Sequence, residues 1–179
     1  YGFVQGADAA AVEMGIADQV VMEYAYGNQF YGDSDITAYM DNWYQTLGVE
    51  VVFACGGGIY TSAVEAALKN NGYVVGVDVD QSTQSDTVIT SAMKGLAESV
   101  IEALTKYYDG GEVYGGSMKL GAADNAVGIP TDTWQLENWS VDDYKALYEK
   151  VVAGEIKIDN DDTMKDPSKA GLENVTFVK

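Results

Sequence analysis

Short apolar runs alternate with segments of helical periodicity from residue 1 to about residue 110 of this chain. Val49–Ala54 and Tyr73–Val77 are near-continuous hydrophobic runs, typical of parallel strands that helices cover on both faces. Between such runs lie segments whose apolar residues recur three and four positions apart. This alternation predicts βαβ units with right-handed crossovers. The predicted fold class is therefore α/β, a parallel sheet flanked by helices.

The same periodicities place the individual elements. The predicted helices cover about residues 3–14, 34–47, 60–70, 96–107 and 141–151, and the predicted strands cover residues 19–26, 49–54, 73–77 and 87–92. Ser140 and Asp143 form a capping-box pattern at the start of the last helix. Residues 111–130 are predicted to form two short strands joined by turns. Beyond residue 158 the chain is charged and rich in turn residues, so we expect no regular structure there.

The first helix starts without a capping residue ahead of it, since its pattern is already under way at Phe3. We therefore expect that its first turn, and the strand before it, lie outside this sequence. No internal repeat and no low-complexity tract is visible.

Composition removes several classes of function. The chain has 28 acidic and 10 basic residues and a formal net charge of −18, which disfavours nucleic acid as a partner because phosphate backbones are repelled. It has no histidine and a single cysteine, Cys55, so His-based catalytic triads, Cys/His zinc sites and an internal disulfide are excluded. Carboxylate-based and binding functions remain.

Candidate binding residues follow the predicted strands, because ligands of open parallel sheets bind beyond the carboxyl ends of the strands. Gly56, Gly57 and Gly58 permit close approach of the backbone to a ligand, and the next helix offers free N–H groups. A tight strand-to-helix turn explains the same glycines equally well. A dinucleotide fingerprint is disfavoured, because Thr61 stands where the third glycine of that motif is needed.

Asp78 and Asp80 end a buried strand, where side-chain alternation would send their carboxylates to opposite sides. Only one of them is then expected to face the cleft, where a carboxylate suits a sugar diol; the other reading is a cap on the next turn. Paired carboxylates for glycoside hydrolysis need acids that face one bond, which adjacent strand positions do not supply. Lys94 ends the next strand and could bind a ligand oxygen or ring nitrogen, pair with Asp78, or be a surface lysine.

Aromatic and acidic residues in two loops have alternative readings. Tyr26 and Phe30 could stack on a planar ligand, although aromatic residues near a strand end are more often part of the core. Asp159, Asp161 and Asp162 resemble calcium ligands, but the glycine and distal glutamate of an EF-hand are missing, which favours a solvated turn. We predict no metal site, no cofactor and no catalytic residue.

The order of the loops resembles one known family. VEVVFACGGGIYTSAVEAALKNNGYVVGVDVDQ, then VITSAMK, KLGAADNAVGIP and VVAGEIKI, resembles the basic membrane protein family of purine-nucleoside-binding lipoproteins of bacterial ABC transporters. The resemblance covers residues 1–158. The chain departs from the family in reading ACGGG where many members read AAGG or AAGL, and in a loop, YGNQFYGD, longer than the usual Y-x-G-S-F.

The resemblance implies a type I periplasmic-binding fold, in which two α/β lobes close on a nucleoside. Residues 1–158 correspond to the carboxy-terminal lobe, with part of residues 95–158 crossing back to an amino-terminal lobe that this sequence lacks, and residues 159–179 form an acidic tail. By the resemblance, Asp78 holds the ribose, Lys94 contacts the base, and Gly56–Gly58 form the glycine loop.

The expected function is that of a non-catalytic receptor that delivers a nucleoside to an ABC permease. The full-length protein is expected on the extracellular face of the membrane, lipid-anchored, or in the periplasm, and the isolated lobe is expected to self-associate. The alternatives are a lobe that binds or senses a sugar or another small metabolite, and a carboxylate-dependent nucleoside-processing enzyme that uses Asp78 as its base.

Overall fold

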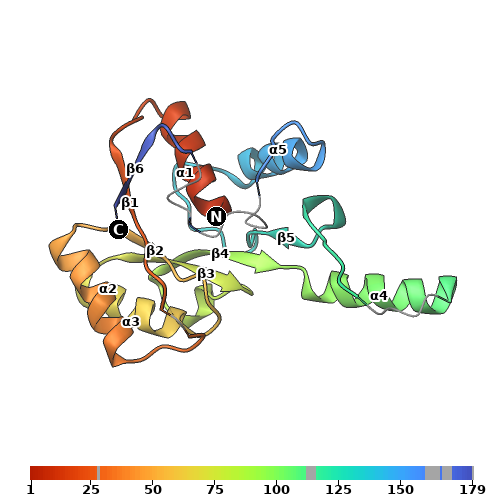
Figure 1. Ribbon diagram of the computed structural model, residues 1–179, viewed down its shortest axis with the longest axis horizontal. Helices are drawn as coiled ribbons and strands as arrows, with labels where there is room; N and C mark the ends of the chain where they lie inside the picture. Colours follow the sequence, from red (N-terminus) through yellow and green to blue (C-terminus); the bar gives the residue numbers. More distant parts are fainter. Residues whose placement is uncertain (28, 112–115, 160–165, 167–170, 179) are drawn as a thin grey trace. The chain divides into compact units, whose positions relative to one another are not determined.

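The computed structural model describes residues 1–27, 29–111, 116–159, 166 and 171–178 (Figure 1). The chain divides into two compact units, one formed by Tyr1–Tyr26 with Ile156–Lys179 and the other by Gly27–Glu155. Parallel sheets flanked by helices make up the structure, which confirms the predicted α/β class.

The larger unit contains a four-stranded sheet in the order β2-β3-β4-β5. Its strands are β2 (Val51–Phe53), β3 (Tyr73–Asp78), β4 (Val88–Lys94) and β5 (Val127–Gly128). The first three are parallel, as predicted, whereas β5 pairs with β4 in antiparallel fashion. The sheet is therefore mixed, and of the two strands predicted over residues 111–130 the described residues form only the two-residue β5.

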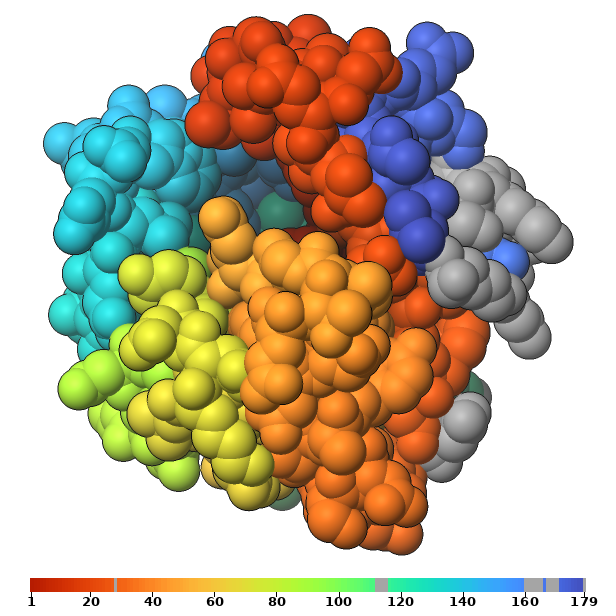
Figure 2. Space-filling view, turned by 90° about the vertical axis from the view of Figure 1, so that its left-hand side faces the viewer, coloured from red at the N-terminus to blue at the C-terminus, as the bar shows by residue number. Residues whose placement is uncertain are grey.

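Two helices, α2 (Ser34–Thr46) and α3 (Tyr60–Asn70), pack against each other and form the core with the sheet. The orange segment that includes α2 lies at the front of the space-filling view (Figure 2). Ala63, Ala66 and Ala67 on α3 are fully buried, and their small side chains let the helix pack closely on β3. Tyr44 of α2 is buried and donates a hydrogen bond to the carbonyl of Tyr73 at 2.7 Å. Burial raises the pKa of Tyr44, so this hydroxyl remains a donor.

The start of α2 is capped by Asp33, whose Oδ1 accepts hydrogen bonds from the amides of Ile36 (2.8 Å) and Asp35 (3.0 Å). Those bonds, with a third from Gln29, lower the pKa of Asp33 although the residue is solvent-exposed. A carboxyl whose pKa is lower in the folded state contributes stability that is present above its unfolded value near 3.8 and is lost as pH falls through its folded value.

We therefore expect Asp33→Asn, which keeps a capping oxygen but removes the charge, to destabilise the chain at pH 7 and to have a smaller effect at pH 2.5. The check is urea denaturation of both proteins at the two pH values. Asp86→Asn, in a loop outside any helix cap, is the control. An effect of Asp33→Asn that is the same at both pH values would contradict the electrostatic part of this cap.

Two further helices follow the sheet, α4 (Leu96–Gly110) and α5 (Val141–Val152), with the 3-10 turn η2 (Ala122–Asp124) between them. Ser140 accepts a hydrogen bond from the Asp143 amide and the Asp143 carboxylate bonds back to the Ser140 amide, which confirms the predicted capping box. No residue of α4 is buried.

The smaller unit contains α1 (Gly2–Glu13), β1 (Val20–Glu23) and β6 (Val175–Val178). β6 pairs with β1 in parallel, with Val20 opposite Val175. Asp8 fixes Asn174, the residue before β6. Its carboxylate accepts hydrogen bonds from the backbone amide of Asn174 at 2.7 Å and from the side-chain amide at 3.1 Å. The expectation that nothing regular follows residue 158 is therefore wrong for residues 175–178, while the lobe boundary at 158 stays a prediction.

Candidate functional site

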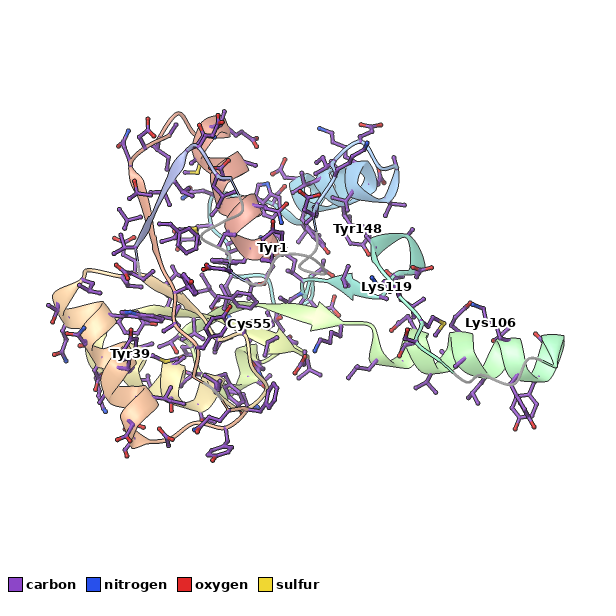
Figure 3. The ribbon with its side chains drawn as sticks, viewed as in Figure 1. Tyr1, Tyr39, Cys55, Lys106, Lys119 and Tyr148 are labelled. Atoms are coloured by element: carbon purple, nitrogen blue, oxygen red, sulfur yellow. The ribbon has the colours of Figure 1, made fainter. Side chains whose placement is uncertain are left out.

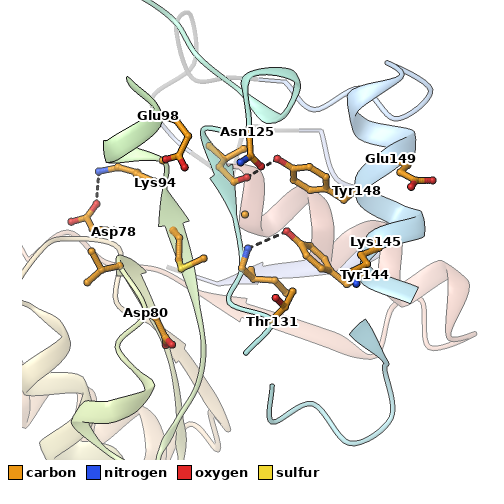
Figure 4. A pocket seen from close by; sticks show the side chains of 16 residues that line it. Asp78, Asp80, Lys94, Glu98, Asn125, Thr131, Tyr144, Lys145, Tyr148 and Glu149 are labelled. Carbon is orange, nitrogen blue, oxygen red and sulfur yellow. Dashed lines mark hydrogen bonds and ion pairs between the residues drawn. The ribbon is translucent and has the colours of Figure 1, made fainter. Parts of the chain in front are cut away.

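An open cavity of about 550 Å³ lies in the larger unit where β3 and β4 end, within the size range of small-molecule sites (Figure 4). Its first wall is formed by Asp78, Met93 and Lys94 at the carboxyl ends of these strands. Its opposite wall comes from β5 and α5, which lie more than thirty residues further along the chain. The cavity is therefore where the topological rule for parallel sheets expects a ligand.

Asp78 is the last residue of β3 and has a φ of +69°, a left-handed conformation that is unusual for a residue other than glycine. Its carboxylate Oδ1 forms an ion pair with Lys94 Nζ at 2.5 Å. The Asp78 side chain is about one-third exposed and that of Lys94 about 61% exposed, so the pair lies at the edge of the cavity. Of the three readings for Lys94, the structure therefore shows the pairing with Asp78.

Asp80 also lines the cavity, but both of its carboxylate oxygens are used internally. Oδ1 accepts from the Ser82 amide at 3.0 Å and Oδ2 accepts from the Thr133 hydroxyl at 2.7 Å. Partial burial favours a higher pKa for Asp80, but the bonds from Ser82 and Thr133 outweigh it and lower the pKa. Asp80 is thus the cap on the turn, whereas Asp78 lines the cavity with its Oδ1 buried against Lys94.

The opposite wall carries two aromatic residues that the sequence did not single out. Tyr144 and Tyr148 lie one turn apart on α5, and both side chains point toward the cavity (Figure 4). Asn125 lies beside them, in a left-handed conformation with φ of +55°. Both tyrosines lie within the last predicted helix, residues 141–151, and their spacing of four places them on one face, where a hydroxyl at the end of each ring signals a role besides core packing.

The glycine loop lies outside this cavity, since none of Gly56, Gly57 and Gly58 lines it. Gly57 has a φ of +48°, and the Gly58 amide donates to the Phe30 carbonyl at 2.7 Å. A Cβ at Gly58 would lie 3.0 Å from that same carbonyl oxygen, so close backbone packing accounts for glycine here. Contact of these glycines with a ligand stays a prediction.

The two predicted stacking residues are exposed. Phe30 is 80% exposed and does not line the cavity. Tyr26 is 63% exposed, packs edge-on against Tyr24 with 5.8 Å between ring centroids, and belongs to the smaller unit. Neither is a core residue, and stacking on a ligand stays a prediction for both.

Cys55 is an exposed free thiol two residues after the end of β2 (Figure 3). Among the described residues, no group of three or more Cys, Asp or Glu side chains is arranged to hold a metal ion. Asp161 and Asp162, two of the three acidic residues weighed as calcium ligands, lie outside the described residues. Within the described part of the chain, no helix is long and apolar enough to cross a membrane.

Nearly the whole chain aligns with a protein of known sequence and family. Basic membrane protein D of Borreliella burgdorferi (strain JD1) is 29% identical over 180 residues, an alignment that covers 97% of this chain and 51% of that protein. The chain thus spans about half the length of this curated relative. A crystal structure described as a transcriptional activator of the comK gene from Bacillus halodurans matches with a TM-score of 0.54 at 18% identity, over 79% of this chain and 47% of that one. At that identity the likeness shows the fold alone.

A family model agrees with the resemblance found in the loops. The model described as ABC transporter substrate-binding protein PnrA-like matches residues 1–162, which include both walls of the cavity. The observed α/β architecture is that of a lobe of a periplasmic-binding-type protein. The chain therefore belongs to the Bmp family of PnrA-like ABC transporter substrate-binding proteins.

Proposed function

We propose that this chain is the carboxy-terminal lobe of a longer ABC transporter substrate-binding protein that captures a purine nucleoside for uptake. The observation that carries this proposal is the Asp78–Lys94 ion pair at the edge of a cavity walled by two tyrosine rings. A carboxylate can accept hydrogen bonds from two neighbouring ribose hydroxyls, and an ammonium group can donate to a base carbonyl or ring nitrogen.

The charges of the cavity also support an uncharged ligand. Asp78 and Lys94 compensate each other, and the other charged residues of the lining, Asp80, Glu98 and Glu149 against Lys145, leave an excess of negative charge that disfavours an anionic ligand. The strongly negative chain, at −18, would repel a nucleotide phosphate. The apolar rings of Tyr144 and Tyr148 offer surface to a planar base. A nucleoside combines the neutral charge, the diol and the planar ring that these groups favour.

Partners and location follow from the same proposal. The longer protein would contribute an amino-terminal lobe that closes on the ligand and would deliver it to an ABC permease. It would act on the extracellular face of the membrane through a lipid anchor, or in the periplasm. Helix α4 supports the second lobe, because none of its side chains is buried in the larger unit and an apolar stripe remains exposed.

The deciding experiment is calorimetric titration of the longer protein with guanosine, inosine, cytidine, ribose and guanosine monophosphate. The purine nucleosides should bind tightest and the nucleotide weakest. Ribose binding as tight as nucleoside binding would instead indicate a sugar receptor. Chromatography of the nucleoside after incubation tests the enzyme alternative, since a receptor returns its ligand unchanged.

Lys94→Met should weaken purine nucleoside binding more than ribose binding, because the lysine is proposed to contact the base and methionine keeps most of its alkyl stem. Lys145→Met is the matched control, since Lys145 lines the same cavity from α5 without an ion pair among the described residues. Titration of both variants with inosine and ribose provides the comparison. Equal losses for the two ligands would assign Lys94 a structural role through Asp78.

A further inference from the structure

Strand β5 is too short to hold its own place in the sheet. It has two residues, Val127 and Gly128, which pair with Lys94 and Met93 at the very end of β4. Two paired residues stabilise a strand very little, because even a longer pair of strands is only marginally stable by itself in water. Other contacts must therefore fix β5 beside Lys94.

Two tyrosine hydroxyls from α5 provide those contacts. Tyr148 Oη donates to the Val127 carbonyl oxygen at 2.8 Å, and the Ala122 carbonyl oxygen, at 3.1 Å, is a second acceptor within reach of the same proton. Tyr144 Oη accepts from the Ile129 amide at 3.1 Å. The pair therefore bonds to backbone groups on both sides of β5.

The tyrosines are themselves held in place. Their rings contact each other with 5.7 Å between centroids, and Trp134 and Trp139 each lie 6.0 Å from the Tyr144 ring. The capping box at Ser140 fixes the start of the helix that carries them. Burial, and then the neighbouring Tyr144, raises the pKa of Tyr148, so its hydroxyl is protonated and can donate at neutral pH.

The segment that leads into β5 also contacts Gly95, the residue after Lys94. The Gly95 amide donates to the Ala126 carbonyl at 2.7 Å, and a Cβ at Gly95 would lie only 2.7 Å from Ala126 Cα. Only glycine allows this crossing of the two backbones. Lys94 is therefore flanked by Val127 in the ladder and by the Gly95–Ala126 crossing, both on the segment that the tyrosines hold.

We propose that Tyr144 and Tyr148 are positioning residues that fix β5 and, through it, place Lys94 at the ligand cavity. The role in ligand binding rests on the proposed function, whereas the effect on Lys94 and Gly95 does not. The two tyrosines thus act through backbone contacts at the strand end, independently of any contact that their rings make with a ligand.

The first test needs no ligand. Amide hydrogen exchange of the 179-residue chain should show faster exchange at Gly95 in Tyr148→Phe and Tyr144→Phe, by several-fold to about tenfold for the loss of one hydrogen bond. Amides of β3 at Val74–Val77 should be unchanged. Tyr39→Phe, an exposed tyrosine on α2, is the control. Unchanged exchange at Gly95 in both variants would overturn the proposal.

The second test is a double-mutant cycle in the longer protein, with inosine as the ligand. Tyr148→Phe should weaken binding by about threefold to tenfold in the wild-type background. The same change should have little effect when Lys94 is already methionine, because the tyrosine acts through Lys94. Equal losses in both backgrounds would overturn this route. If the wild type binds no nucleoside while Gly95 exchange responds as expected, the proposed function fails and the positioning role stands.

Discussion

Asp78→Ala should weaken nucleoside binding to the longer protein by about 1.5–3 kcal/mol, roughly 10- to 150-fold, which is the usual range for hydrogen bonds to a charged group. Asp80→Ala should weaken it much less. The reason is that Asp80 already uses its two carboxylate oxygens on Ser82 and Thr133, whereas Asp78 lines the cavity with only Lys94 as an ionic partner among the described residues.

For stability, the two positions should rank in the opposite order, with the larger loss at Asp80. Asp80→Ala removes the cap of the turn after β3 and should lower the midpoint of thermal unfolding more than Asp78→Asn does. Asp78→Asn is the sharper binding variant, because asparagine tolerates the left-handed backbone at φ of +69° and only the charge is lost. Calorimetric titration and thermal unfolding of all three variants provide the data. Equal or inverted binding losses at the two positions would contradict the assignment of Asp78.

Elements with strong local signals could be predicted from the sequence. The limits expected for the helix over residues 60–70 agree with α3, and the capping box at Ser140 is present in α5. Periodicity and caps are properties of neighbouring residues, so they can be read without knowing the fold. β6 was missed because its four residues are stabilised by β1, which is more than 150 residues away in sequence. No local pattern contains that pairing.

The residues of the candidate site were also predictable only in part. Asp78 and Lys94 were expected at one edge because they end successive parallel strands, and the structure joins them in an ion pair. Tyr144 and Tyr148 were not expected at the site, because only the antiparallel return through β5 brings their helix to it. For the glycine loop the sequence allows both a ligand loop and a tight turn, and its conformation satisfies backbone packing against Phe30.

The 179-residue chain on its own should form a dimer or a larger assembly. Six large apolar side chains of α4 are at least half exposed, an unusual density for one helix of a protein that works alone in water: Leu96, Val100, Ile101, Leu104, Tyr107 and Tyr108. They recur at helical spacing, so they form a stripe that a second copy can cover. In the longer protein the amino-terminal lobe is proposed to cover it instead.

A stable pairing would have to bury at least about 1,200 Å², the lower end of specific interfaces, and the net charge of −18 on each copy opposes it at low salt. Association should therefore strengthen as salt is added. Light scattering after size exclusion should give a mass of at least twice 19.2 kDa. Leu104→Lys should shift the chain toward monomer, whereas Leu68→Lys, at a leucine on α3 that is even more exposed than Leu104, should not. A compact monomer at tens of micromolar and physiological salt would show that the α4 stripe is stable in water without a partner.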